Sequence, residues 1–209
     1  MLEFLNTKPL KVNYKQKPSD ELFETIRIEN GNISNLAYHQ ARVFFAFRNY
    51  YKSKALFSLK EFLQDIPKNG LYRAKVVYNK SGVLSINFYP YQAKKIKRVM
   101  LIENNLFEYR FKYLNREFFD YLHQNFEADE FIITQYGYIK EFTIGNIAFF
   151  ENNKKKWITP AKPFLLGTTL QALKKNSTFN LSLKNINYKD LQKYSKIAIL
   201  NAMLKFRIL

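Results

Sequence analysis

The residue best suited to covalent chemistry lies near the middle of the chain. Lys112 stands between Phe111 and Tyr113, whose rings could shield its amine from water. A buried amine loses proton affinity, and a neutral amine can attack a carbonyl group to form a Schiff base. Taken alone, this stretch favours an ordinary surface lysine, because lysines are frequent all along the chain.

Two further groups could contribute to a site. Gly167, Thr168 and Thr169 stand at the expected start of a helix, where free backbone N–H groups and hydroxyls can converge on an anion. Threonine is also a common helix cap, so this signal is weak by itself. Glu141 is a carboxylate among apolar neighbours, and its simplest interpretation is an ordinary loop residue.

The elements around these residues follow from hydrophobic periodicity. Residues 22–29 predict a strand with Glu24 on the face of Leu22 and Ile26. Neither face is cleanly apolar, so the strand is expected to lie over a site or an interface. On a helix predicted over 37–54, His39 and Arg42 fall about one turn apart. The simplest interpretation of that pair is a histidine packed on the core and an arginine in water.

The remaining pattern mixes strands and helices. Ser58 and Glu61 form a capping box that predicts a short helix ended by Pro67. Other helices are predicted from Asn115, over 167–173 and over 190–194. After a short edge strand within 1–20, strands are expected at 71–78, 83–89, 98–102, 130–134, 146–150, 156–159, 197–200 and 206–209. The fold class is α/β (α+β), with domains at 1–103 and 111–209 and a linker at 104–110.

Composition narrows the alternatives. The 209 residues are 47% hydrophobic and 17% aromatic, as in a folded globular chain. The chain has no cysteine, which excludes a thiolate metal site, and its two distant histidines argue against a histidine-rich centre, so no metal is expected. No signal peptide or membrane-spanning run is recognisable, so a cytoplasmic protein with no membrane partner is expected.

A net charge of +17 invites a nucleic-acid interpretation, since basic surfaces attract phosphate backbones. The lysines are scattered, however, and no recognised nucleic-acid-binding motif accompanies them. The leading expectation is therefore no nucleic-acid partner. A basic binding protein that has lost its catalytic function stays open as an alternative of a different class.

Five short motifs, taken in order, resemble those of the class IV, or fold-type IV, pyridoxal-phosphate enzymes. This family includes branched-chain aminotransferases, D-amino-acid aminotransferases and 4-amino-4-deoxychorismate lyases. The resemblance covers nearly the whole chain, from about residue 22 to 209. Its strongest parts lie at 22–27, 38–42, 139–147, 157–160 and 165–169. It implies a two-domain fold, with a small N-terminal α/β domain and a C-terminal pseudo-barrel domain, working as a homodimer.

The resemblance also implies roles for single residues. Lys112 matches the lysine that holds pyridoxal 5'-phosphate covalently and later moves protons. Glu141 matches the carboxylate bonded to the pyridine nitrogen, and Arg42 matches the arginine that grips the phosphate. The other positions expected to contact the cofactor are Gly167, Thr168, Thr169 and Ile144.

Within the family, the run from Lys112 to Arg116, Lys-x-Leu-Asn-Arg, is most similar to 4-amino-4-deoxychorismate lyases. These enzymes convert a small-molecule amine, 4-amino-4-deoxychorismate, to 4-aminobenzoate and pyruvate in folate biosynthesis. Candidates for binding substrate carboxylates are Arg73, Lys75 and Thr25, which could equally be sheet-edge polar groups. The alternative activity is that of a class IV aminotransferase of the branched-chain or D-amino-acid type. The chain departs from the family in a short loop at 79–82, which leaves substrate identity less defined than cofactor binding.

Overall fold

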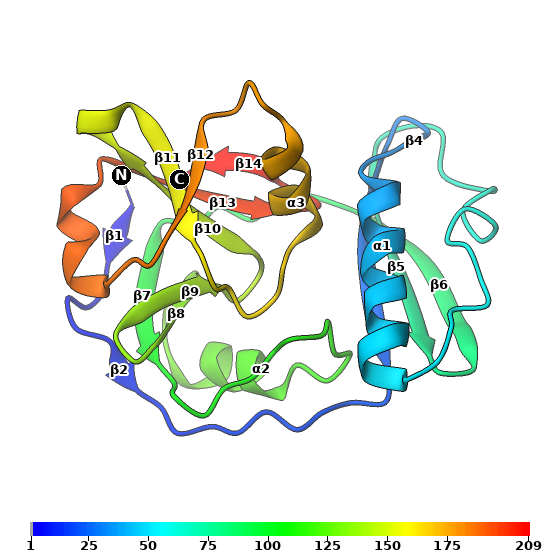
Figure 1. The fold of residues 1–209 in the computed structure, drawn as a ribbon, viewed down its shortest axis with the longest axis horizontal. Helices are drawn as coiled ribbons and strands as arrows, with labels where there is room; N and C mark the ends of the chain where they lie inside the picture. The colour runs from blue at the N-terminus through cyan, green and yellow to red at the C-terminus, as the bar shows by residue number, and fades with distance from the viewer. Residues whose placement is uncertain (1) are drawn as a thin grey trace. The chain divides into compact units, whose positions relative to one another are not determined.

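The computed structural model describes residues 2–209. Over this range the fold is a mixed α/β arrangement, with the strands in three sheets and short helices between them (Figure 1). By their internal contacts these residues divide into two compact units. Unit 1 contains the chain up to Gln16, Lys94–Arg110 and Arg116–Leu209, and unit 2 contains Lys17–Ala93 and Phe111–Asn115.

This division differs from the predicted boundaries at 103 and 111. The strands β1 (Glu3–Phe4) and β2 (Leu10–Lys11) both pair in parallel with β7 (Arg98–Glu103). β7 in turn pairs in parallel with β8 (Glu130–Gln135). Parallel ladders join segments that are far apart in sequence, so composition along the chain does not reveal them. β7 therefore belongs to unit 1 and Lys112 to unit 2, the reverse of the predicted assignment.

Unit 2 contains an antiparallel sheet of four strands in the order β4-β3-β5-β6. The strands predicted at 22–29, 71–78 and 83–89 are confirmed. Asn30 and Gly31 form the first turn with φ values of 48° and 74°, the left-handed pair that a tight hairpin requires. The strands are β3 (Leu22–Glu29), β4 (Asn32–Ile33), β5 (Leu71–Asn79) and β6 (Gly82–Pro90).

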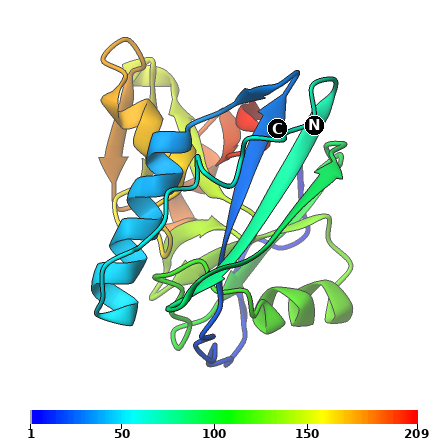
Figure 2. The same cartoon turned by 90° about the vertical axis from the view of Figure 1, so that its right-hand side faces the viewer.

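The helix α1 (Leu36–Ala46) lies along one face of this sheet (Figure 2). It continues as a π-helical segment, η1 (Phe47–Tyr51), and ends at Lys52, which has a φ of 53°. The helix predicted over 37–54 is thus confirmed in place and slightly shorter in extent. His39 and Val43 face inward because their spacing of four residues puts them on one stripe.

The helix predicted from the capping box at Ser58 is wrong. Its reciprocal contacts do form, since the Ser58 N–H donates to Glu61 and the Lys60 N–H donates to Ser58 Oγ. The backbone bonds that follow span three residues, as in tight turns, and the chain continues as turns and bends up to Pro67. Gln40 instead holds the segment, accepting from the Leu59 N–H at 2.7 Å. Tertiary contact has replaced helical propensity here.

Unit 1 contains two sheets. One has the order β1-β7-β8-β9, with β2 paired to β7, and the other has the order β12-β11-β10-β13-β14. The strands predicted at 130–134, 146–150 and 156–159 are confirmed, and they pair in the antiparallel ladders β8–β9 and β10–β11. The remaining strands are β9 (Tyr138–Phe142), β10 (Asn146–Glu151), β11 (Lys156–Pro160), β12 (Leu181–Lys184), β13 (Lys196–Asn201) and β14 (Lys205–Ile208).

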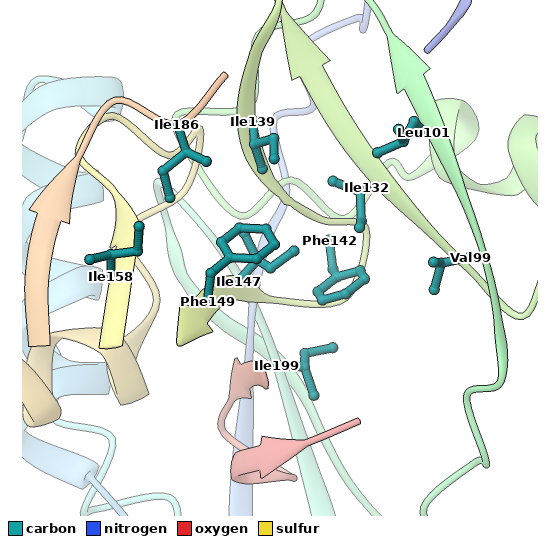
Figure 3. Close-up of a cluster of buried hydrophobic side chains, with 10 residues drawn as sticks. All are labelled: Val99, Leu101, Ile132, Ile139, Phe142, Ile147, Phe149, Ile158, Ile186 and Ile199. Carbon is teal, nitrogen blue, oxygen red and sulfur yellow. The ribbon is translucent and has the colours of Figure 1, made fainter. Parts of the chain in front are cut away.

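The core of unit 1 lies between its two sheets. Side chains from both sheets meet in one buried cluster, shown in Figure 3. Each buried side chain of this size contributes about 1.5–3 kcal/mol of transfer free energy. β9 and β10 both contribute side chains to this cluster, and both strands also carry residues of the candidate site. Its members are Val99, Leu101, Ile132, Ile139, Phe142, Ile147, Phe149, Ile158, Ile186 and Ile199.

The helices of unit 1 are short. α2 (Glu117–Asn125), within the helix predicted from Asn115, buries Phe118, Phe119 and Leu122, whereas Tyr121 is exposed. α3 (Thr168–Lys175) begins where the Gly-Thr-Thr motif predicts a helix. Two short 3-10 segments are η2 (Asn152–Lys154), which directly follows β10, and η3 (Tyr188–Lys193), which lies where a short helix was predicted over 190–194. No helix within residues 2–209 is long and apolar enough to cross a membrane.

Candidate functional site

Lys112 is held by the first residues of β3. The Phe23 N–H donates to the Lys112 carbonyl at 2.9 Å, and the Leu114 N–H donates to the Glu21 carbonyl at 2.9 Å. Leu22 and Tyr113 form an antiparallel bridge between these two bonds. The segment carrying the predicted catalytic lysine is therefore bonded along the edge of β3 as a short strand would be.

The side chain of Lys112 lies over an aromatic ring. Its Nζ is 4.4 Å from the centre of the Phe23 ring, a distance at which the ring attracts a cation. The side chain is half-buried, and the neighbouring rings of Phe111 and Tyr113 are buried, as their sequence predicts. Lys75 Nζ lies 5.5 Å from the same ring. Phe23 thus brings together the predicted catalytic residue and a predicted substrate-binding residue.

A buried cluster of charged and polar groups lies between β3 and α1. Glu24 is fully buried and accepts from Arg42 Nε at 2.8 Å and from a terminal nitrogen of Arg42 at 2.5 Å. His39 Nδ1 lies 2.5 Å from Glu24 Oε2. Burial by itself raises the pKa of Glu24, but the Arg42 charge and the hydrogen bonds from His39 and Arg42 outweigh it and lower that pKa to about 2.

The pKa of His39 is lowered in these surroundings, whereas a histidine paired with a carboxylate ordinarily has a raised pKa. Burial lowers its pKa, and the positive charges of Arg42 and Lys112 add to this effect, against the attraction of Glu24. A neutral imidazole with its proton on Nδ1 fits this geometry, because that nitrogen then donates to the carboxylate. The ion pair is therefore between Glu24 and Arg42, with His39 as a neutral donor.

The guanidinium of Arg42, predicted to grip a phosphate, is oriented by this carboxylate. Two of its nitrogens bind Glu24 in the bidentate geometry that suits a planar fork. Sequence reasoning did not assign Glu24 to the site. The signal was available, because a carboxylate occupied the otherwise apolar face of β3 beside Leu22 and Ile26. Its role toward a phosphate stays a prediction.

The predicted substrate-binding residues share the face of the sheet opposite α1. Thr25 pairs directly with Lys75 across β3 and β5, and Arg27 pairs with Arg73. The Arg73 guanidinium lies 5.1 Å from the Tyr89 ring centre. Since side chains alternate along a strand, Thr25, Arg73 and Lys75 project on the side that carries Phe23. This face is basic and aromatic rather than apolar.

In unit 1, Glu141 is a buried carboxylate near the end of β9. Its Oε2 accepts from the Leu165 N–H at 3.1 Å and from Asn146 Nδ2 at 3.3 Å. These contacts fix its direction, since a carboxylate held by two donors has little rotational freedom. The predicted ordinary loop carboxylate is therefore excluded, and Glu141 is an oriented, desolvated acid.

Asn146 is the residue that joins Glu141 to α3. Its Nδ2 also donates to the Leu165 carbonyl at 2.9 Å, and its Oδ1 accepts from the Gly167 N–H at 3.0 Å. A Cβ added to Gly167 would lie 2.3 Å from that Oδ1. The close approach of Asn146 Oδ1 favours glycine at this position, whereas the backbone does not, because its φ of −68° is one that any residue adopts. Sequence reasoning placed Asn146 in a motif without a role.

The start of α3 fits an anionic group. Its N-cap is Gly167, which has no side chain to accept from the first-turn N–H groups. Thr168 and Thr169 are buried, and the Thr169 Oγ1 atom has no hydrogen-bond partner among residues 2–209. A buried hydroxyl without a partner costs about 1–3 kcal/mol, which an incoming acceptor would remove. The phosphate of pyridoxal 5'-phosphate is such an acceptor, so these residues fit the cofactor.

Ile144 lies in the tight turn between β9 and β10. Phe142 and Gly145 close this turn with backbone bonds in both directions, of 2.8 and 3.3 Å. The Ile144 carbonyl accepts from Asn201 Nδ2 at 3.1 Å, and 40% of the residue is exposed. Ile144 is therefore an exposed apolar residue in a restrained turn, and its contact with the cofactor stays a prediction.

The predicted residues therefore lie in both units. In unit 2, Lys112 and Lys75 lie near the Phe23 ring, and the Glu24–Arg42 cluster lies on the face of the sheet toward α1. Unit 1 brings together Glu141 and the start of α3. Among residues 2–209, no group of three His, Cys, Asp or Glu side chains could hold a metal ion.

Known proteins place the chain in a family. The model of "Amino-transferase class IV" matches residues 21–208. An "uncharacterized protein" of Haemophilus influenzae is 34% identical over 188 residues, which cover 87% of this chain and 97% of that protein.

Solved structures agree. A "putative 4-amino-4-deoxychorismate lyase" of Haemophilus somnus is 31% identical, with 88% of this chain and 96% of that chain covered and a TM-score of 0.78. An aminotransferase of Brucella abortus, bound to the cofactor PLP, is 15% identical, with 95% of this chain and 85% of that chain covered and a TM-score of 0.67, which shows a shared fold. Together with the family model, these relatives confirm the resemblance read from the five motifs. The chain belongs to the class IV aminotransferase family.

Proposed function

We propose that this chain is a pyridoxal-phosphate-dependent 4-amino-4-deoxychorismate lyase, which forms 4-aminobenzoate and pyruvate in folate biosynthesis. The lyase assignment is supported by the Lys-x-Leu-Asn-Arg run at 112–116 and by the 31% identical relative that carries this description. The observation that carries the cofactor assignment is the link between Glu141 and the start of α3 through Asn146. It joins an acid for the pyridine nitrogen to a place for the phosphate.

Each cofactor-binding residue has a distinct task. Glu141 keeps the pyridine nitrogen protonated, and Ile144 contacts the ring. Bound pyridoxal phosphate supplies an electron sink for the carbon next to the substrate amine. The phosphate is held by Arg42 and by the start of α3, with Gly167, Thr168 and Thr169.

Lys112 would hold the cofactor through its side-chain amine and, once released by the substrate amine, would move the proton at substrate C4. Its support is positional. The backbone on both sides of Lys112 is bonded to β3, and its Nζ rests on Phe23. A lysine restrained in this way loses little conformational freedom when it reacts.

The substrate is a small amine with carboxylate groups. Lys75, Arg73 and Thr25 lie on one face of the β3–β5 pair, on the side of Phe23, and supply cations and a hydroxyl to those carboxylates. We further propose the two-domain architecture of fold-type IV enzymes, a homodimer in the cytoplasm, and no nucleic-acid or membrane partner.

The cofactor proposal is tested by absorption spectra of the purified protein with added pyridoxal phosphate. The wild type is expected to show a protein-bound visible band that Lys112→Ala loses and that Lys80→Ala, at the β5–β6 turn, keeps. A colourless wild type with salt-sensitive affinity for nucleic acid would instead favour a basic binding protein.

The second candidate is a class IV aminotransferase, favoured by the family match and by the Brucella abortus relative. Product analysis separates the two activities. Pyruvate released from 4-amino-4-deoxychorismate without a 2-oxo acid acceptor is the expected result for the lyase. A strict requirement for the acceptor would identify an aminotransferase.

A further inference from the structure

Glu130, the first residue of β8, is a buried carboxylate that the proposed reaction does not use. It is 2% exposed, and its Oε1 accepts from the Thr143 hydroxyl and from the Phe131 N–H, the latter at 3.0 Å. Charged side chains are seldom buried unless they have a structural or chemical task. The contact with Thr143 shows where that task lies.

Thr143 is held at each of its polar groups. Its N–H donates to the Phe131 carbonyl at 3.1 Å, its hydroxyl donates to Glu130, and its carbonyl accepts from an Arg116 guanidinium nitrogen at 3.1 Å. The Arg116 guanidinium is itself placed over the Phe119 ring, 4.4 Å from its centre. Glu130 and Arg116, which belong to different elements, thus anchor one residue from two sides.

Thr143 opens the turn that connects two residues of the candidate site. It follows Glu141 by two positions and directly precedes Ile144, and Asn146 begins β10 just after the turn. A turn this short transmits a displacement of one residue to its neighbours, because its dihedral angles have little freedom. The hydrogen bonds to Thr143 therefore restrain the positions of Glu141 and Ile144.

We infer that Glu130 is a positioning residue, which acts through Thr143 to hold the turn of residues 143–145 in the geometry that receives pyridoxal phosphate. Arg116 adds a second side-chain anchor, at the Thr143 carbonyl. This inference rests on the proposed function, because it assigns Glu141 and Ile144 to the cofactor. Glu130 itself needs no contact with the cofactor.

The test compares wild type, Thr143→Val, Thr143→Ser and a matched control, Thr134→Val. Thr134 is a buried threonine of the same strand as Glu130, and its hydroxyl donates to Glu103 Oε2 at 2.5 Å. The control therefore loses the same kind of threonine–carboxylate bond without touching the turn. Two quantities are measured: the Kd for pyridoxal phosphate by absorbance titration, and amide hydrogen exchange of Phe142 and Gly145 in the protein without cofactor.

Thr143→Val is expected to raise the Kd about tenfold, the scale of one lost buried hydrogen bond, and to speed exchange in the turn. Thr143→Ser keeps the hydroxyl and restores both values, while Thr134→Val changes neither. The inference is overturned if Thr143→Val binds the cofactor and exchanges like the wild type, or if Thr134→Val weakens binding equally. A wild type that does not bind pyridoxal phosphate would overturn the proposed function, and this inference with it, whatever the exchange data show.

Discussion

Asn146 Oδ1 accepts the Gly167 N–H at 3.0 Å, and it lies so close to Gly167 that a Cβ there would stand 2.3 Å from it. One oxygen thus both binds the residue before α3 and excludes a side chain from it. Because the amide nitrogen of Asn146 donates to Glu141, the pair ties the position of the helix to that of the carboxylate. The distance between two parts of the candidate site is set by a single side chain.

Gly167→Ala is expected to lower the free energy of unfolding by about 1–3 kcal/mol, because overpacking displaces Asn146 or the start of α3. The same displacement is expected to weaken pyridoxal phosphate binding. Urea unfolding and absorbance titration measure the two effects. In an Asn146→Ala background the clashing oxygen is gone, so the added methyl group should cost less than in wild type. Equal costs in both backgrounds would show that the contact with Asn146 is not the constraint.

Glu24 gives a prediction for acid stability. Its pKa is about 2 in the folded protein and about 4.5 when unfolded, so the stability it contributes is complete above the unfolded value and is lost as pH falls toward 2. Wild type should therefore lose about 2 kcal/mol through this group between pH 5.5 and pH 3. Glu24→Gln should lack that loss and, by leaving Arg42 without its carboxylate, be about 3–5 kcal/mol less stable near neutral pH.

Urea unfolding at several pH values measures this. Glu29→Gln is the matched control, since Glu29 pairs with Arg27 at 2.7 Å on the same strand but is partly exposed. Its cost should be within about 1 kcal/mol. If Glu24→Gln and Glu29→Gln are equally stable, the buried cluster does not have the assigned charge arrangement.

The fold was largely predictable where structure is local. The patterns at 22–29, 71–78 and 83–89 predict the strands of unit 2, and β5 and β6 pair as neighbours in sequence, whereas the pairing of β3 with β5 spans α1 and has no local signal. The pairing of β1, β2 and β8 with β7 escaped prediction, since a parallel ladder leaves no turn signal between its strands. The helix predicted from the capping box at Ser58 is absent although its local signal is strong. Gln40 supplies a tertiary hydrogen-bond partner that competes with the helix.

The candidate site divides in the same way. Candidate groups that stand out by side-chain type, such as Glu141 or the Gly-Thr-Thr motif, could be named from the sequence, and the roles that the family resemblance implies for them stay predictions. Residues that act by touching those groups could not. Asn146 contacts Glu141 on the preceding strand, and Glu130 contacts Thr143 in the turn after β9. Amide and carboxylate side chains are common, so neither residue type marks a site by itself. Their assignment needs the contact itself.

Lys75 gives a prediction for substrate binding. Lys75→Met keeps the apolar stem and removes the charge beside Phe23, so the KM for 4-amino-4-deoxychorismate should rise about tenfold while kcat changes less. Lys80→Met makes the same charge change at the exposed β5–β6 turn and should leave both constants close to wild type. Initial rates of pyruvate release measure this. Equal behaviour of the two variants would remove Lys75 from the substrate site.

The pH dependence of stability predicted for Glu130 is opposite in direction to that predicted for Glu24. Burial raises its pKa to about 7, against the lowering by hydrogen bonds from Thr143 and the Phe131 N–H and by the charge of Arg116. A carboxyl group whose folded pKa is raised favours the folded state most when protonated. Its contribution is therefore present below about 4.5 and is lost as pH rises toward 7. The loss is about 3 kcal/mol.

Glu130→Gln keeps an acceptor for Thr143 and cannot ionise, so its stability relative to wild type should increase between pH 5 and pH 8. Over the acid range, Glu24→Gln should gain on wild type as pH falls, in the reverse direction. Each variant removes one negative charge from a chain of net charge +17, so a general charge effect would move both curves the same way. Free energies of unfolding from urea titrations, taken for all three proteins in one pH series, measure the two slopes. Parallel curves for Glu130→Gln and wild type would show that Glu130 does not titrate in the range assigned to it.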